Sequence, residues 1–76
     1  MRPEQMRVLV TFETTTAAMA FEALCAAKGV PGRLIPLPEQ ISAGCGLAFS
    51  APPEAMDALA ALFPRPGCAA PRQMLL

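Results

Sequence analysis

The chain has 76 residues, six of them basic and six acidic, so its formal net charge is zero. This length allows one domain. Without a basic excess, a nucleic-acid partner is not expected, because such partners bind through Lys and Arg. No apolar stretch reaches the ~20 residues that cross a bilayer, and no signal peptide is visible, so we expect a cytoplasmic protein without a membrane partner. Three cysteines, an odd number, argue against a disulfide framework.

The first half of the chain predicts a strand followed by a helix. Residues 6–12 are β-branched and apolar, as in a central strand. Thr14 or Thr15 is a good N-cap for a helix over 15–28, and Gly29 suits its C-terminal cap. The apolar stripe of this helix is predicted to comprise Ala17, Ala20, Phe21, Leu24 and Lys28.

A second strand, over 33–37, is predicted to lie at an edge of the sheet. Pro36 and Pro38 lack N–H groups and stand two residues apart, so both gaps in the ladder face the same side. That arrangement is tolerated only where the side is unpaired. A third strand is predicted over 46–51 and ends at the two prolines that follow it.

A second helix follows, with Glu54 and Asp57 in its first turn, and it stops at Pro64. Its buried face is predicted to hold Ala55, Met56, Leu59, Leu62 and Phe63. Residues 73–76 could add a fourth strand. The order predicts an α+β, ferredoxin-like βαββα(β) sandwich, with an antiparallel sheet and both helices on one face.

Three segments follow from these elements. Residues 1–5 are expected to be a disordered extension and residues 6–63 the single domain. Residues 64–76 are expected to be a proline-rich tail.

The cysteines are the residues best suited to chemistry. The chain has no histidine, so nucleophile–histidine systems are excluded, and no Cys-x-x-Cys suggests a metal site. Cys25 falls on or beside the helical stripe and is expected to be a core residue. Cys68 is expected to be an exposed thiol, or else a resolving partner for another cysteine.

Cys45 stands between Gly44 and Gly46, just before the third strand. The glycines are expected to leave the sulfur uncrowded and to let backbone N–H groups turn toward it. In the predicted topology the loop lies near the N-terminus of the first helix, where a thiolate is stabilised. Alternatively, Cys45 is a small apolar filler of a tight loop. Ser42, Thr14 and Thr15 are candidate hydrogen-bond partners of a group carried on the sulfur.

The run Pro38-x-x-Ile41-Ser42-Ala43-Gly44-Cys45-Gly46-Leu47 resembles the signature of a bacterial family described as putative Se/S carrier protein-like. The segments from Val10 to Thr15 and from Gly29 to Pro36 are similar to that family too. The resemblance covers about residues 6–63. It implies a cysteine, Cys45 here, that carries sulfur or selenium as a transient adduct, with no other cofactor. Thr16 stands where the family often has a histidine, and the proline-rich tail replaces the usual final strand.

Three functions remain open. The first is a non-enzymatic carrier that receives sulfur or selenium on Cys45 from a donor such as a cysteine desulfurase. The second is a small binding or regulatory module, a homodimer, in which Cys45 is structural; a net charge of zero does little to oppose self-association. The third is a thiol oxidoreductase that pairs Cys45 with Cys68, which needs their Cα atoms within ~7 Å. Metal trafficking ranks below all three.

Overall fold

The computed structural model describes residues 5–38, 41 and 44–75. The predicted N-terminal extension therefore lies almost entirely outside the described residues. The elements are β1 (Met6–Thr11), α1 (Thr15–Lys28), β2 (Arg33–Pro36), β3 (Leu47–Ala51), the 3₁₀-helix η1 (Pro53–Ala55), α2 (Met56–Ala60) and β4 (Arg72–Leu75).

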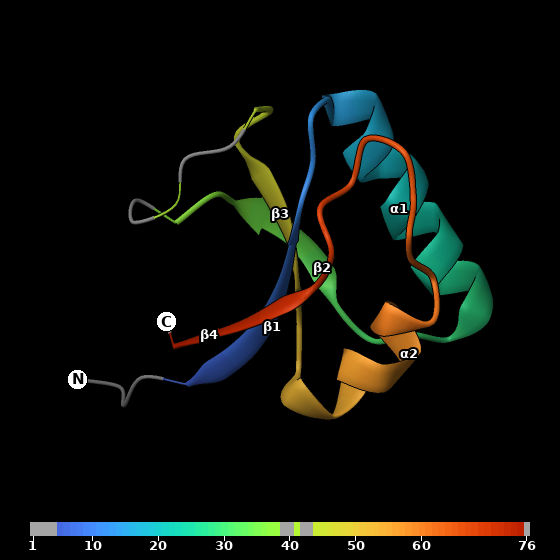
Figure 1. Cartoon of the computed structure of the whole chain (residues 1–76), viewed down its shortest axis with the longest axis vertical. Coiled ribbons are helices and arrows are strands. Elements are labelled where there is room, and N and C mark those ends of the chain that lie inside the picture. Colours follow the sequence, from blue (N-terminus) through green and yellow to red (C-terminus); the bar gives the residue numbers. More distant parts are fainter. Residues whose placement is uncertain (1–4, 39–40, 42–43, 76) are drawn as a thin grey trace.

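The four strands form one sheet in the order β2-β3-β1-β4, and every neighbouring pair is antiparallel. Figure 1 shows α1 and α2 on the same face of this sheet, while the other face has no helix. The predicted α+β sandwich of the ferredoxin-like kind is confirmed. β1 and β3 are the central strands, as predicted, because the α1 crossover leaves space between β1 and β2 for β3.

β2 is an edge strand, as its two prolines predict. The Leu37 N–H donates to the Gly46 carbonyl across the β2–β3 pair at 2.9 Å. Backbone groups of successive strand residues point to opposite sides, so Pro36 and Pro38 both turn toward the open edge. The missing donors therefore cost no ladder hydrogen bond.

α1 has the predicted ends but a different buried stripe. The Thr14 hydroxyl accepts from the Ala17 N–H at 3.1 Å, and Gly29 closes the helix in the left-handed region. The buried residues are Ala18, Phe21 and Cys25, whereas the predicted Ala20 and Lys28 are exposed. Alanines occur all round this helix, so the sequence shows the helical period but leaves the rotation about its axis to the contacts made with the sheet.

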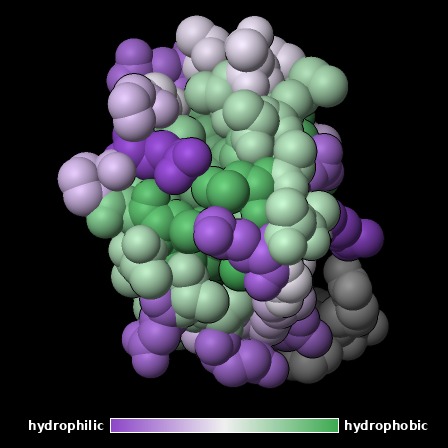
Figure 2. Space-filling model, turned by 90° about the vertical axis from the view of Figure 1, so that its right-hand side faces the viewer, coloured by the Kyte–Doolittle hydropathy of each residue, from purple (hydrophilic) through white to green (hydrophobic). Residues whose placement is uncertain are grey.

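The second helix is shorter than predicted. It ends at Ala60, and Leu62 and Phe63 follow it in irregular chain. Both side chains still pack against the hydrophobic core, although they are half-buried rather than enclosed. Figure 2 views this helical side of the molecule and shows apolar residues across its middle, with hydrophilic ones between them and at the lower end. The short helix and the chain beyond it together cover the sheet.

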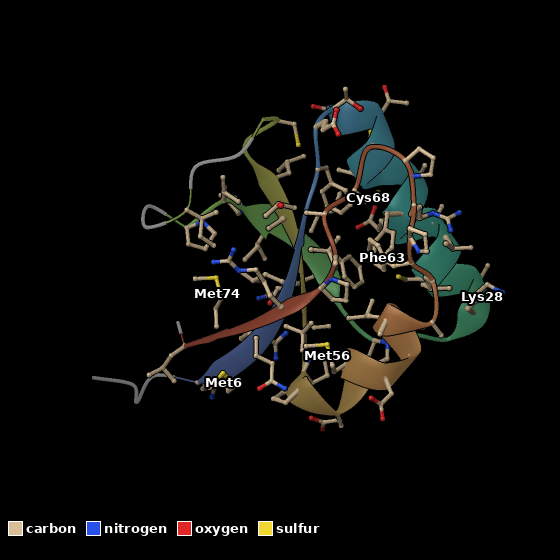
Figure 3. All side chains as sticks on the ribbon, in the orientation of Figure 1. Met6, Lys28, Met56, Phe63, Cys68 and Met74 are labelled. Carbon is tan, nitrogen blue, oxygen red and sulfur yellow. The ribbon has the colours of Figure 1, made fainter. Side chains whose placement is uncertain are left out.

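The segment after Phe63 is part of the folded unit rather than a detached tail. Phe12 and Cys68 form an isolated antiparallel bridge, flanked by the bonds Ala69 N–H to Thr11 O and Glu13 N–H to Gly67 O, both 2.9 Å. β4 then pairs with β1, which confirms the fourth strand within a residue of its predicted limits. Figure 3 shows the labelled Cys68 beside β1 on the helical side.

Phe21 of α1 is the centre of the core. Its ring lies 5.4 Å from that of Phe49 on β3, 5.6 Å from that of Phe12 and 5.7 Å from that of Phe63, measured between centroids. These tilted and edge-to-face geometries are the favourable ones for aromatic pairs. One residue therefore joins the helix, both central strands and the chain after α2.

Replacing this central ring should destabilise the whole fold. For Phe21→Leu we expect a loss of about 1–2 kcal/mol in the free energy of unfolding, because three ring contacts go and a cavity remains. Urea unfolding followed by circular dichroism measures the loss. Met19→Ala on the same helix is the control, because Met19 is 60% exposed and should change stability by less than about 0.5 kcal/mol. Equal effects of the two substitutions would contradict this account of the core.

Candidate functional site

The loop that carries Cys45 lies against the junction between β1 and α1. β3 pairs with β1 so that Ala48 is opposite Thr11, which brings the residues before β3 beside those after β1. The Cys45 N–H donates to the Phe12 carbonyl at 3.4 Å. Phe12 and Glu13 directly precede Thr14, the N-cap of α1. The expected neighbourhood of Cys45 and the start of α1 is thus present in the backbone.

The two glycines around Cys45 have different roles. A Cβ on Gly44 would lie 2.9 Å from the Glu13 carbonyl oxygen, so only glycine permits this close approach of the two chains. Gly46 has φ 77°, in the left-handed region, and open space beside it. Gly44 therefore lets the loop pack on the chain that leads into α1, whereas Gly46 turns the chain at an open point, and the access expected for the sulfur remains a prediction.

The Cys45 sulfur is half-buried at the margin of the core. Its thiol donates to the Leu47 carbonyl at 3.9 Å, a distance suited to a weak sulfur hydrogen bond. Among the hydrogen bonds of the described residues, none runs from an α1 amide to this sulfur. A thiolate stabilised by the helix therefore remains a prediction.

The supporting residues are placed unequally. The Thr14 hydroxyl is occupied as an acceptor in the helix cap, although its own O–H remains available to donate. Thr15, the first residue of α1, is exposed. Ser42 lies outside the described residues. Sequence reasoning missed Phe12 and Glu13. They contact the loop through backbone atoms, so their side-chain types do not indicate the contact.

The other two cysteines differ in burial. Cys25 is 1% exposed in the core, as predicted, and burial raises the pKa of its thiol, with Arg65 opposing the effect in part. Cys68 is half-buried rather than exposed, because the bridge to Phe12 draws it onto the sheet. Burial also raises the pKa of the Cys68 thiol; Arg65 lowers it and Glu13 raises it further.

Cys45 and Cys68 lie on opposite sides of Phe12. Cys45 contacts Phe12 from the side on which β1 pairs with β3, and Cys68 contacts it from the side on which β1 pairs with β4. Two strand spacings separate them, about 10 Å between Cα atoms, which exceeds the ~7 Å limit for a disulfide. The thiols of Cys25, Cys45 and Cys68 are all free. The arrangement therefore does not favour the oxidoreductase reading.

Two further findings concern the described part of the chain. No three Cys, Asp or Glu side chains within it gather in a way that would hold a metal ion. None of its helices has the length and apolarity needed to pass through a membrane.

With this geometry established, comparison with known proteins identifies the family. The family described as "Putative Se/S carrier protein-like" matches residues 7–66 of the chain, which is most of its length. The chain belongs to this family. A search of curated proteins and a search of solved structures each return no match. The matched range contains all the residues of the Cys45 loop and stops before Cys68.

Substitution of the loop glycines should separate their two roles. We expect Gly44→Ala to cost about 1–3 kcal/mol of stability, because its methyl group collides with the Glu13 backbone. Gly46→Ala should cost about 1 kcal/mol through its positive φ alone, and Gly46→Asn less, since Asn tolerates this conformation. Urea unfolding of the three variants measures these values. A Gly44→Ala variant as stable as the original protein would refute the close approach.

The raised thiol pKa values predict a loss of stability in alkali. Because the folded state holds the thiol protons of Cys25 and Cys68 more tightly than the unfolded state, their contribution is full below the ordinary thiol pKa. It is lost as the pH rises through the raised folded-state pKa. We expect unfolding free energies measured at about pH 7 and about pH 10 to differ less in a Cys25→Ala/Cys68→Ala variant than in the original protein. An equal difference in both would contradict the burial effect.

Proposed function

We propose that this protein is a carrier that accepts sulfur or selenium on Cys45 and passes it on without conventional catalysis. The observation that carries the proposal is the position of Cys45. It lies in a glycine-flanked loop with open space beside Gly46, next to the residues that lead into α1. Membership of the Se/S carrier-like family supports it. Cys25 is buried in the core, and burial raises the pKa of the Cys25 and Cys68 thiols, which lowers their reactive thiolate fraction at neutral pH.

The transfer step needs only a thiol and a donor. The Cys45 thiolate attacks the outer sulfur of a donor cysteine persulfide. A new sulfur–sulfur bond forms at Cys45, the sulfur–sulfur bond of the donor breaks, and the donor cysteine leaves as a thiolate. The outer sulfur keeps its proton, so charge and atoms balance and no separate oxidant is consumed. Delivery to an acceptor thiolate is the same exchange in reverse.

The residues around the sulfur have specific tasks in this proposal. Release of the weak bond from the Cys45 thiol to the Leu47 carbonyl accompanies ionisation. The free amides at the start of α1 then favour the anion, and the hydroxyls of Thr14 and Thr15 donate to the carried atom. Ser42 is assigned the same task from its place in the sequence. The open space beside Gly46 accommodates the added sulfur or selenium.

The donor in this proposal is a cytoplasmic cysteine desulfurase. Such an enzyme supplies its sulfur as the cysteine persulfide that the exchange requires. No resident cofactor is needed, because the carried atom is cargo on Cys45 itself. The chain contains no histidine for acid–base assistance, which agrees with a carrier rather than an enzyme.

Intact-protein mass spectrometry after incubation with a cysteine desulfurase and cysteine tests the proposal. We expect the original protein and Cys68→Ala to gain one sulfur atom that a reductant removes, and Cys45→Ala to gain none. Selenocysteine in place of cysteine tests selenium in the same assay. Equal labelling of Cys45→Ala and the original protein, or no labelling of either, would exclude the carrier role.

The second candidate, a binding module with a structural Cys45, is favoured by one observation. The thiol packs at the core margin and donates to the Leu47 carbonyl, as a loop-stabilising residue would. Urea unfolding of Cys45→Ala separates the two readings. A structural role gives a loss above about 1 kcal/mol, whereas a carrier role gives a smaller loss together with complete loss of labelling.

A further inference from the structure

The face of the sheet that carries no helix is defined by the strand register. Val8 and Val10 of β1 belong to the core, so Arg7 and Leu9 point to the opposite face. Residues directly opposite on neighbouring strands share a face. Figure 3 shows the labelled Met74, the partner of Arg7, on the side of the sheet away from the helices.

Three arginines lie on this open face. Arg7 comes from β1 and is partnered by Met74. Leu9 points to the same face as Arg7 and lies in a cross-strand row that also contains the other two arginines. In this row Arg72 of β4 is opposite Leu9, Leu9 is opposite Ser50, and Ser50 is opposite Arg33 of β2. All three basic residues of the described strands therefore share the face. The four strands contain no acidic residue.

The described acidic residues are elsewhere. Glu13 lies between β1 and α1, and the rest belong to the helical layer: Glu22 to α1, Glu54 to η1 and Asp57 to α2. Among the described residues, the carboxylates of the helical layer share that side with Lys28 and Arg65, whereas the described strands carry only basic charged residues. The open face thus offers three guanidinium groups without a strand-borne carboxylate to neutralise them.

A hydrogen bond fixes one arginine at the centre of the open face. Ser50 is only 4% exposed, and its hydroxyl accepts from the Arg7 Nε at 3.0 Å. This bond holds the Arg7 side chain across the face beside the buried Leu9 and leaves its terminal nitrogens to donate. Arg33 and Arg72 are exposed, while Ile35 and Met74 add half-buried apolar surface to the same face.

We propose that this face, made of Arg7, Arg33, Arg72, Ile35 and Met74, is a docking surface for a partner protein that presents carboxylates around apolar side chains. Guanidinium forks match carboxylates in pairs, and Arg and Met are enriched where proteins meet. Nucleic acid fits less well, because single strands bind by stacking on aromatics. Phe12, Phe21 and Phe49 are buried, and Phe63 packs on Phe21. A second copy set face to face would oppose arginines to arginines.

The arginines of the surface lie away from the Cys45 loop. Arg33 pairs with Ser50, five residues along the chain from Cys45, whereas Ile35, at the near end of the surface, pairs with Ala48, three residues from it. The inference therefore does not rest on the proposed sulfur transfer. A Cys45→Ala variant should bind a partner of this kind with unchanged affinity.

Heteronuclear NMR titration with a short synthetic peptide of glutamate and leucine tests the proposal. We expect shifts of the Arg7, Arg33 and Arg72 Nε–H signals. Arg33→Gln/Arg72→Gln should weaken binding roughly tenfold. The matched control Lys28→Gln/Arg65→Gln removes the same charge from the helical layer and should weaken it less than about twofold. Figure 3 shows Lys28 on the side opposite Met74.

Four outcomes would overturn the docking surface. The first is the absence of shifts on this face at millimolar peptide. The second is equal weakening by the two double variants, which would show a general charge effect. The third is tighter binding of an oligothymidylate of equal charge, which would indicate nucleic acid instead. The fourth is concentration-dependent self-association abolished by Arg33→Gln/Arg72→Gln, which would assign the face to a second copy.

Discussion

The packing of Phe21 against three other phenylalanines is the contact on which the architecture depends. A chain of this length gains only about 3–5 kcal/mol from its core, so a few side chains must contribute most of this stability. Phe21 joins α1 to Phe12 at the end of β1, to Phe49 of β3 and to Phe63 beyond α2. The cluster therefore fixes the helix on the two central strands and closes the gap that the short α2 leaves.

The position of Cys45 follows from that arrangement. With β1 and β3 paired at the centre, the loop before β3 must pass the chain that leaves β1 for α1. Gly44 allows the two backbones to approach closely, and Cys45 follows beside open space at Gly46. The family relationship and the geometry thus concern the same loop. The carrier chemistry proposed for it uses one thiol, and the strand order places the backbone of this loop beside the residues that lead into α1.

The two sides of the sheet differ in their charged residues as well as in whether helices pack on them. The helical side holds the aromatic cluster together with Glu22, Glu54, Asp57 and Lys28, whereas the open face holds the three arginines of the strands. Because the thiol loop lies at one end of the sheet, sulfur exchange and partner docking need not compete for the same surface. A carrier that meets both a donor and an acceptor benefits from a docking face distinct from its reactive group.

Much of the fold could be predicted from local signals. The Thr14 and Gly29 caps, the edge prolines Pro36 and Pro38, and the apolar run of β1 each act through neighbouring backbone atoms, so the sequence alone determined the element order and the edge position of β2. The family signature around Cys45 is likewise local. The tertiary structure alone decided which face of α1 is buried, how Cys68 is drawn onto β1, and that three arginines from three strands share one face. Those features depend on helix rotation and strand register, which arise from contacts between residues far apart in the chain.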